Sequence, residues 1–303
     1  MWGGTDERDS IHTIHAALEK GINLIDTAPV YGFGLSENIV GKAIAEYGHR
    51  EQVVIATKVG LDWKDGNVFR NCTKARVLEE IEQSLKRLRT DYIDLYQVHW
   101  PDPLVPIEET AEVLHELQRQ GRIRAIGVSN YSSEQMESFR RVAPLHTSQS
   151  RYNLFERDIQ RDVLPYCQKQ DIDVLAYSSI CRGLLSGKMQ LNTQFKGDDV
   201  RKSDPKFQAP RYKQYLRAVE LLDQVARERF GKRVIHLAIR WLLDEPGIST
   251  TLWGARRPDQ LAPVDGVFGW SMDSNTREDV EKIARDTIKD PAGPEFMEPP
   301  ARK

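Results

Sequence analysis

Short apolar segments alternate with amphipathic segments along most of this 303-residue chain. The apolar segments have the length and composition of buried strands, and the amphipathic segments repeat apolar residues with a helical period. Seven strands are predicted, and they begin at Asn23, Val53, Tyr92, Ile123, His146, Asp171 and Ser249. Strands and helices that alternate with short links are typical of parallel β/α units, and the pattern favours them over a sandwich or a helical bundle.

Helices are expected between and after these strands. Their predicted ranges are 10–20, 36–47, 73–88, 107–120, 133–142, 159–170, 212–230 and 234–243. Ser10 is a plausible N-cap for the first helix, because a hydroxyl there accepts a bond from an unpaired helical N–H. Residues 183–211 are loop-like and charged, and a loop of that length is usually functional or mobile.

The composition limits the classes of partner. The 43 Lys and Arg residues nearly balance 45 Asp and Glu residues, so nothing favours nucleic acid or an anionic membrane. No apolar run suggests a membrane span, and the first residues do not resemble a signal peptide. The three widely spaced cysteines indicate neither disulfides nor a metal cluster. We therefore expect one cytoplasmic domain over residues 1–303, without a metal, as a monomer or weak homo-oligomer.

Four reactive side chains follow the first three predicted strands. Asp26, Lys58 and His99 end these strands, and Tyr31 lies one loop beyond the first. In a β/α barrel the reactive groups gather at the carboxyl ends of the strands. A phenol is a poor acid near neutral pH, but a carboxylate and a cation nearby can lower its pKa and relay charge. Each residue alone is more often structural, yet the four together predict catalysis.

Common enzyme motifs are missing from the sequence. There is no Gly-x-Ser-x-Gly, no His-Glu-x-x-His and no phosphate-binding Gly-x-x-x-x-Gly-Lys. Gly32-Phe33-Gly34 is followed by Glu37 where a dinucleotide fingerprint has its third glycine, which excludes a Rossmann site. A nicotinamide cofactor would need a different cradle.

The four strand-end residues resemble the catalytic tetrad of the aldo-keto reductases. The resemblance continues in residues 126–130, 152–155, 182–188 and 253–258 and covers essentially the whole chain. Within that family the chain is most similar to the bacterial general stress protein 69 type, through residues 98–103 and 293–297. The resemblance implies a (β/α)8 TIM barrel, a role in stress response, and NADPH-dependent reduction of aldehydes and ketones to alcohols.

The resemblance also implies a role for each site residue. Tyr31 would be the general acid, Lys58 paired with Asp26 would stabilise the phenolate, and His99 would orient the carbonyl. The residues implied for the nicotinamide end of the cofactor are Ser129, Asn130 and Gln149 at the carboxamide and Tyr177 on the ring. Those implied for its phosphates are Ser178, Arg182, Gly183, Leu184, Lys188 and Arg201, with Gly254, Ala255, Arg256 and Gln260 at the adenosine 2′-phosphate.

The chain departs from the family pattern in three places. Leu261–Asp265 replaces residues that usually hold adenine, and Ser179 replaces a frequent proline. Met1-Trp2-Gly3-Gly4 resembles a segment that normally follows the first strand. We therefore expect the N-terminal hairpin and the first barrel strand to be missing, because the numbering starts at an internal methionine or the chain is a fragment.

Two other functions stay open at this stage. A cofactor-binding regulatory subunit, like the aldo-keto reductase-like β-subunits of potassium channels, would keep the pocket without turnover. A barrel that lacks its first strand would instead be inactive, because the turn after that strand normally contacts the nicotinamide.

Overall fold

The computed structural model describes residues 6–293 and 297–302, so the expectation for residues 1–4 lies outside it. Seven strands form the main sheet, in the order β1-β2-β5-β6-β7-β8-β9, and every neighbouring pair is parallel. They are β1 (Leu24–Asp26), β2 (Val54–Val59), β5 (Ile93–Val98), β6 (Ile123–Ser129), β7 (Thr147–Arg151), β8 (Asp173–Tyr177) and β9 (Ile248–Thr251). The seven predicted strands are confirmed, each within two residues of its predicted start.

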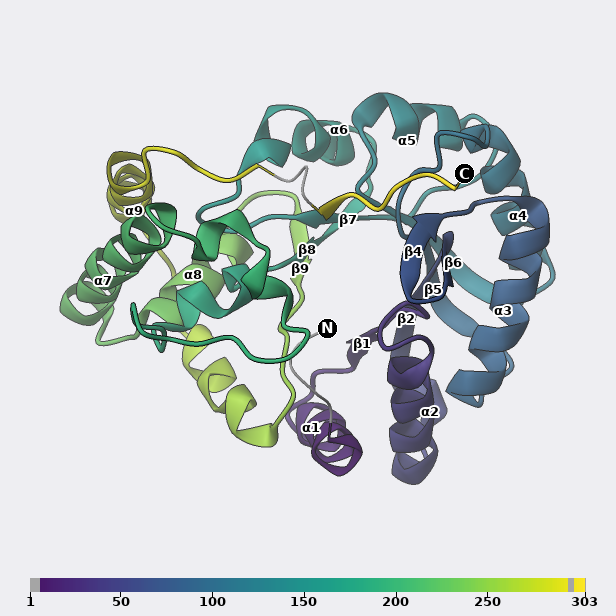
Figure 1. The fold of residues 1–303 in the computed structure, drawn as a ribbon, viewed down its shortest axis with the longest axis horizontal. Helices are drawn as coiled ribbons and strands as arrows, with labels where there is room; N and C mark the ends of the chain where they lie inside the picture. Colours follow the sequence, from purple (N-terminus) through teal and green to yellow (C-terminus); the bar gives the residue numbers. More distant parts are fainter. Residues whose placement is uncertain (1–5, 294–296, 303) are drawn as a thin grey trace.

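The sheet curls around an axis, and the helices cover its outer side (Figure 1). Their bounds are α1 (Glu7–Glu19), α2 (Leu35–Tyr47), α3 (Lys74–Leu88), α4 (Ile107–Arg119), α5 (Ser133–Arg140), α6 (Val163–Lys169), α7 (Arg211–Phe230), α8 (Val234–Leu243) and α9 (Ser274–Thr287). Strands β1 and β9 are the two end strands of the sheet in the described part of the chain. The chain thus has the α/β barrel-type fold that the strand and helix pattern predicts.

Helix α1 begins earlier than predicted. Asp6, not Ser10, is the N-cap, because its Oδ1 accepts a bond from Asp9 N at 2.9 Å. Ser10 lies inside the helix and donates its hydroxyl hydrogen to Asp6 O at 2.6 Å. The predicted N-cap is therefore wrong: an aspartate four residues upstream already supplies the acceptor.

Several elements were not predicted. An antiparallel hairpin, β3 (Leu61–Lys64) and β4 (Asn67–Arg70), follows β2 and turns at Asp65-Gly66, where both residues have positive φ. Helix α9 was missed too, and the predicted helix over residues 159–170 is interrupted at Asp162. The described residues also form short 3-10 helices: η1 (Arg50–Gln52), η2 (Asp158–Arg161), η3 (Cys181–Ser186), η4 (Val200–Lys202), η5 (Pro205–Phe207) and η6 (Pro258–Val267).

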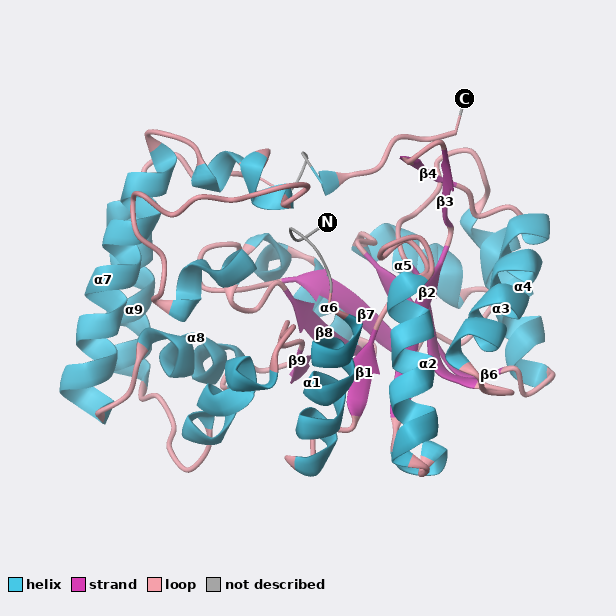
Figure 2. Ribbon diagram, turned by 60° about the horizontal axis from the view of Figure 1, so that its bottom comes forward, coloured by secondary structure: helices cyan, strands magenta, loops and turns pink. Residues whose placement is uncertain are grey.

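Two large apolar clusters join the sheet to its helices. One packs β2, β5 and β6 against α2 to α5, and the other packs α7, α8 and α9 against the region around β8. Figure 2 shows these helices standing beside the sheet, with the β3–β4 hairpin at one end of it. No described helix combines the length and the apolar character that crossing a membrane requires.

Candidate active site

The inner face of the curled sheet carries a layer of small and apolar side chains. Its members are Leu24, Ala56, Leu95, Ala125 and Leu175, which form one cluster. Because side chains of a strand alternate between its faces, the residue two positions later on each strand also faces inward. Those residues are Asp26, Lys58, Gln97, Gly127 and Tyr177. The apolar layer therefore forms the floor of a polar layer at the carboxyl ends of the strands.

An ion pair lies at the centre of this polar layer. Lys58 Nζ is 2.7 Å from Asp26 Oδ2 and donates a second bond to Thr27 O at 3.0 Å. The lysine side chain is 1% exposed and the aspartate side chain 16%. Burial disfavours the ammonium, but the charge of Asp26, with the hydrogen bonds from Lys58 to Asp26 and Tyr31, outweighs burial and raises the pKa of Lys58. Lys58 is therefore a buried cation at neutral pH.

Two glutamine side chains complete the surroundings of Asp26. Gln149 Nε2 donates to Asp26 Oδ1 at 2.7 Å, and Gln97 Nε2 lies 3.5 Å from the same oxygen. Gln149, expected to hold a carboxamide, thus uses its own amide nitrogen on the ion pair, and its role toward a cofactor stays a prediction. Gln97 was missed, although it is a polar residue within the apolar run of β5.

Tyr31 lies over the ion pair. Lys58 Nζ is 5.1 Å from the centre of its ring, and the His99 ring meets it edge-on at 5.8 Å. Burial raises the pKa of Tyr31, and the opposing effect of the Lys58 charge does not reverse this. The predicted lowering of this pKa is therefore wrong. The phenol is protonated at neutral pH, which is the form that a general acid needs.

His99 is fixed through its backbone. Its N–H donates to Val59 O at 2.8 Å, and its carbonyl accepts from Asn130 Nδ2 at 3.0 Å. Burial, together with the Lys58 charge, holds the pKa of the imidazole well below its usual value. The ring is thus neutral at pH 7 and can donate one N–H bond to an oxygen. The predicted tetrad of Asp26, Tyr31, Lys58 and His99 is brought together in one place.

Three of the residues expected at the nicotinamide end lie beside His99. Asn130 has a left-handed backbone, with φ of 61°, and its Nδ2 also donates to Ser129 Oγ at 3.0 Å. The Tyr177 hydroxyl donates to Asn130 Oδ1 at 2.8 Å. These bonds fix the orientation of the amide, so Ser129, Asn130 and Tyr177 form one preorganised group.

The segment expected to wrap the phosphates is a compact turn. Cys181, Arg182 and Gly183 all have positive φ, and Ser178 has φ of 59°. Backbone N–H groups in this turn already donate within it, namely those of Cys181, Gly183, Leu185 and Gly187. These four N–H groups are therefore poor candidates for contacts with a cofactor phosphate. Leu184 is fully buried in the apolar cluster of α7 and α8.

Cationic side chains surround the same turn. Arg182 Nη1 is 3.0 Å from Asp204 Oδ2, and Arg201 Nη2 is 2.6 Å from Asp199 Oδ2. Arg201 Nη1 also lies 3.4 Å from the carbonyl oxygen of Arg182. These contacts join the turn at 178–188 to the loop at 199–204. The predicted positions Arg182 and Arg201 are thus close together.

The segment after β9 supplies a further charged group. The carbonyl oxygen of the Gln260 side chain accepts from the backbone N–H groups of Arg256, at 2.7 Å, and Arg257, at 3.3 Å. Gln260 therefore shapes the start of η6, and this contact was not predicted. Gly254 and Arg256 are exposed, Ala255 is half-buried, and Lys188 is exposed. The Arg256 charge contributes, after Arg201, to holding the pKa of Asp199 below its usual value.

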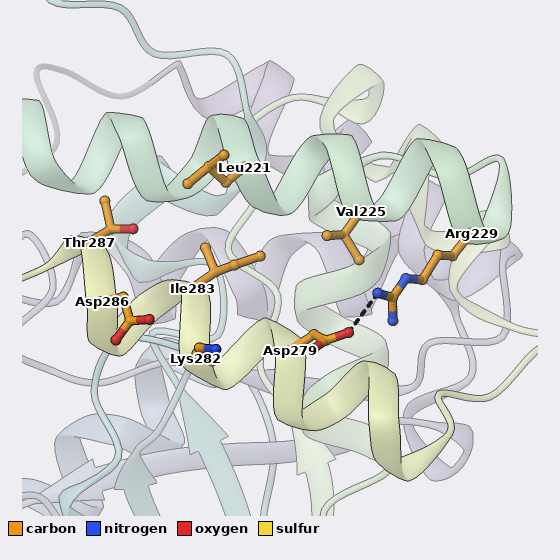
Figure 3. Close-up of a pocket in the computed structure, with 8 residues that line it drawn as sticks. All are labelled: Leu221, Val225, Arg229, Asp279, Lys282, Ile283, Asp286 and Thr287. Atoms are coloured by element: carbon orange, nitrogen blue, oxygen red, sulfur yellow. Dashed lines mark hydrogen bonds and ion pairs between the residues drawn. The ribbon is translucent and has the colours of Figure 1, made fainter.

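A groove elsewhere on the molecule carries none of this chemistry. It lies between α7 and α9 and is lined by Leu221, Val225 and Ile283, with an ion pair between Arg229 and Asp279 across it (Figure 3). Among the described residues no group of His, Cys, Asp and Glu could hold a metal ion. The strand-end cluster is therefore the candidate active site.

Comparison with known proteins decides the family. The model of the aldo/keto reductase family matches residues 1–285. The chain belongs to this family. Its members are oxidoreductases that act on small carbonyl compounds with nicotinamide cofactors, in agreement with the four groups at the strand ends.

The similarity extends over the whole barrel. Aldo-keto reductase YhdN of Bacillus subtilis is 62% identical over 303 residues, which are 100% of this chain and 92% of that protein. The NADH-specific methylglyoxal reductase of Escherichia coli is 35% identical over 276 residues, 86% of this chain and 83% of the reductase. The structure of the glycerol dehydrogenase AKR11B4 from Gluconobacter oxydans matches with a TM-score of 0.88 at 50% identity, covering 97% of this chain and 90% of that one.

Proposed function

We propose that this protein reduces aldehydes and ketones to alcohols with NADPH, and that Tyr31 is the general acid. The observation that carries this proposal is the Tyr31 phenol lying over the buried Lys58 ammonium, which Asp26 holds at 2.7 Å. A protonated phenol beside a fixed cation can release its proton to a developing alkoxide, because the cation stabilises the phenolate that is left.

Each protein group has one task in the proposed reaction. A reduced nicotinamide bound beside Asn130 would supply the hydride that reaches the carbonyl carbon. Tyr31 donates its hydroxyl proton to the carbonyl oxygen, and that proton becomes the hydroxyl hydrogen of the alcohol. Neutral His99 donates an N–H bond to the same oxygen and orients it. Lys58 stabilises the phenolate until a proton from solvent restores Tyr31.

The chain contains groups that suit such a cofactor. Both Nδ2 hydrogens of Asn130 are already donated, to His99 O and Ser129 Oγ, so Asn130 Oδ1 and Ser129 Oγ are the atoms that keep capacity to accept a bond from a carboxamide. Arg182, Arg201 and Arg256 supply guanidinium groups around the segment expected to hold the phosphates, where Arg182 and Arg201 already pair with Asp204 and Asp199. A guanidinium binds a phosphate with two parallel bonds. Exposed Lys188 follows the same turn in sequence and is a fourth candidate cation. The relative from Escherichia coli is NADH-specific, so the cofactor differs among relatives. We assign the choice of NADPH in this chain to Arg256, because a guanidinium suits the 2′-phosphate.

The further features of this proposal concern the setting of the enzyme. We place residues 1–303 in a single domain of the general stress protein 69 type. We assign it to the cytoplasm, with a role in stress response, as a monomer or weak homo-oligomer. A regulatory subunit that binds the cofactor without turnover is the competing function.

The test is oxidation of NADPH or NADH by wild-type protein and by Tyr31→Phe, with a panel of aldehydes and ketones. We expect turnover with NADPH and a loss of at least about 100-fold in kcat for the variant, at unchanged cofactor affinity. Equal rates for the two proteins would exclude Tyr31 as the acid. Tight NADPH binding without turnover of any carbonyl would favour the regulatory subunit.

The cofactor preference needs its own variant. Arg256→Leu should raise KM for NADPH about tenfold or more and leave KM for NADH within twofold, because only NADPH carries the 2′-phosphate. Exposed Arg285→Leu on α9 is the matched control. If both cofactors weaken equally, Arg256 does not read the 2′-phosphate.

A further inference from the structure

The segment at residues 297–302 runs from the end of β7, where Arg151 Nη1 lies 3.6 Å from Met297 Sδ, to the β3–β4 hairpin, as the yellow end of the ribbon in Figure 1 shows. We call residues 297–302 the strap. Its last described residue, Arg302, forms an ion pair with Asp102, whose side chain is fully buried. Asp102 lies three residues after His99, so the strap ends beside the turn that carries the imidazole.

Asp102 organises that turn. Its carboxylate accepts from Cys72 N at 3.0 Å and from Leu104 N at 2.9 Å, which ties the end of the turn to the segment before α3. Within the described residues, Arg302 supplies the cation that pairs with this buried carboxylate. A buried carboxylate is costly when its partner is removed, because its charge is then left without compensation.

A second contact ties the strap to the same turn. Arg70 at the end of β4 donates its backbone N–H to Pro300 O at 2.9 Å and pairs with Ala301 in a short parallel bridge. The Arg70 guanidinium donates to Pro101 O at 3.2 Å, one residue before Asp102. It also pairs with Glu298 of the strap. Two consecutive residues of the turn, Pro101 and Asp102, are thus held by the strap or through its partner Arg70.

We propose that Arg302 is a positioning residue for His99. By pairing with Asp102 it fixes the turn at residues 99–102, and the turn holds the imidazole beside Tyr31. The start of the turn is already fixed by the bonds of His99 to Val59 and Asn130. The strap fixes the other end, so the ring is set from both sides. The catalytic consequence rests on the proposed reductase function.

The test compares Arg302→Gln, Arg302→Lys and the control Arg285→Gln, each as the full chain. We expect Arg302→Gln to lower kcat/KM for an aromatic aldehyde by about ten- to a hundredfold, since displacement of a reacting group by about 1 Å has such an effect. The Kd for NADPH should stay within twofold. Arg302→Lys should recover most of the activity, and Arg285→Gln should match wild type.

Amide hydrogen exchange tests the same idea without turnover. Exchange at Cys72 and Leu104, whose N–H groups bind Asp102, should accelerate in Arg302→Gln and not in Arg285→Gln. The double variant Asp102→Asn/Arg302→Gln should exchange more slowly than Arg302→Gln, because no buried charge is left unpaired. If Arg302→Gln folds poorly, the double variant replaces it in the kinetic and exchange measurements.

The outcomes separate the two proposals. If wild-type protein reduces no carbonyl, the proposed function fails, and exchange still decides whether Arg302 fixes the turn. Wild-type kcat/KM in Arg302→Gln would overturn the positioning role. A matching loss of NADPH affinity, with faster exchange throughout the barrel, would also overturn it, because that result indicates a general structural role.

Discussion

Lys58 Nζ lies 2.7 Å from Asp26 Oδ2, and the two residues come from neighbouring parallel strands. Their pairing places a cation directly under the Tyr31 ring while both strands remain anchored in the apolar floor. The position of the cation thus follows from strand register, because Asp26 and Lys58 each lie two positions after a residue of the apolar floor on their own strand.

Breaking this pair should damage both stability and activity. Lys58→Met leaves the largely buried carboxylate of Asp26 without its cation, which costs about 3 kcal/mol in the free energy of unfolding. Reductase activity should fall by about 100-fold or more, because nothing then stabilises the phenolate. Urea unfolding and steady-state kinetics measure the two effects. If Asp26→Asn/Lys58→Met is no more stable than Lys58→Met, the lost pairing is not the cause.

His99 should make stability fall in mild acid. Its pKa is lower in the folded state than in the unfolded chain, so the unfolded chain binds this proton more readily. The contribution of the neutral imidazole to the free energy of unfolding is fully present above about pH 6.5. It is lost as the pH falls, by at most about 1.4 kcal/mol per pH unit. The check is the difference in unfolding free energy between wild type and His99→Gln from pH 5 to 8. A difference that does not change with pH would contradict the burial of a neutral imidazole.

Glu80 should make stability fall as the pH rises, which is the opposite of the effect of His99. Burial raises its pKa to about 7 even though it pairs with Arg76 and accepts a bond from Gly60 N. Its folded pKa lies above its unfolded value, so the protein loses stability as the pH rises through 7. Glu80→Gln should therefore stabilise the protein at pH 8, by at most about 3 kcal/mol. The gain should vanish near pH 4.5. Lower stability of Glu80→Gln at pH 8 would show that the ion pair with Arg76 outweighs burial.

Gly127 should tolerate no side chain. A Cβ there would lie 2.3 Å from Thr147 Oγ1 and 2.8 Å from Gln97 Cγ, so Gly127→Ala must displace both side chains or the backbone between them. We expect a loss of about 1–3 kcal/mol in unfolding free energy, and lower activity because Gln97 supports Asp26. Gly254→Ala is the control for stability, since a Cβ there meets no atom of the described residues within 4 Å. Equal stability of Gly127→Ala and wild type would show that the neighbouring strand yields.

Much of the framework could be predicted because the strands are apolar and end in polar residues. Asp26, Lys58 and His99 were found as the last polar residues of three such runs. Gly127 and Gln97 were missed because their roles depend on which inner-face residue of the adjacent strand they contact. The sequence of one strand does not reveal that neighbour. The direction of the Tyr31 pKa was also missed, since it depends on whether burial or the Lys58 charge dominates.

The local sequence explains other differences between the predicted and the observed structure. Asp65-Gly66 is a strong hairpin signal, but the strands on either side are only four residues long and half-polar, so they resemble a loop. The contact of Gln260 with the backbone of Arg256 and Arg257 could not be predicted. The sequence does not show whether a glutamine side chain caps its own helix or binds a ligand. The strap was not predicted as an element because its contacts are with the distant residues Arg70 and Asp102.

The alternation along β2 has a consequence for how such a chain can change in length. Lys58 faces inward, and Thr57 faces outward, where its hydroxyl donates to the buried Glu37. Inserting or deleting one residue before Lys58 in this strand would exchange the two faces, removing the ammonium from the site and burying it among helices. Length changes should therefore be tolerated at the exposed Asp65-Gly66 turn and excluded from the strand. A series of single-residue insertions across residues 54–66 would map that boundary.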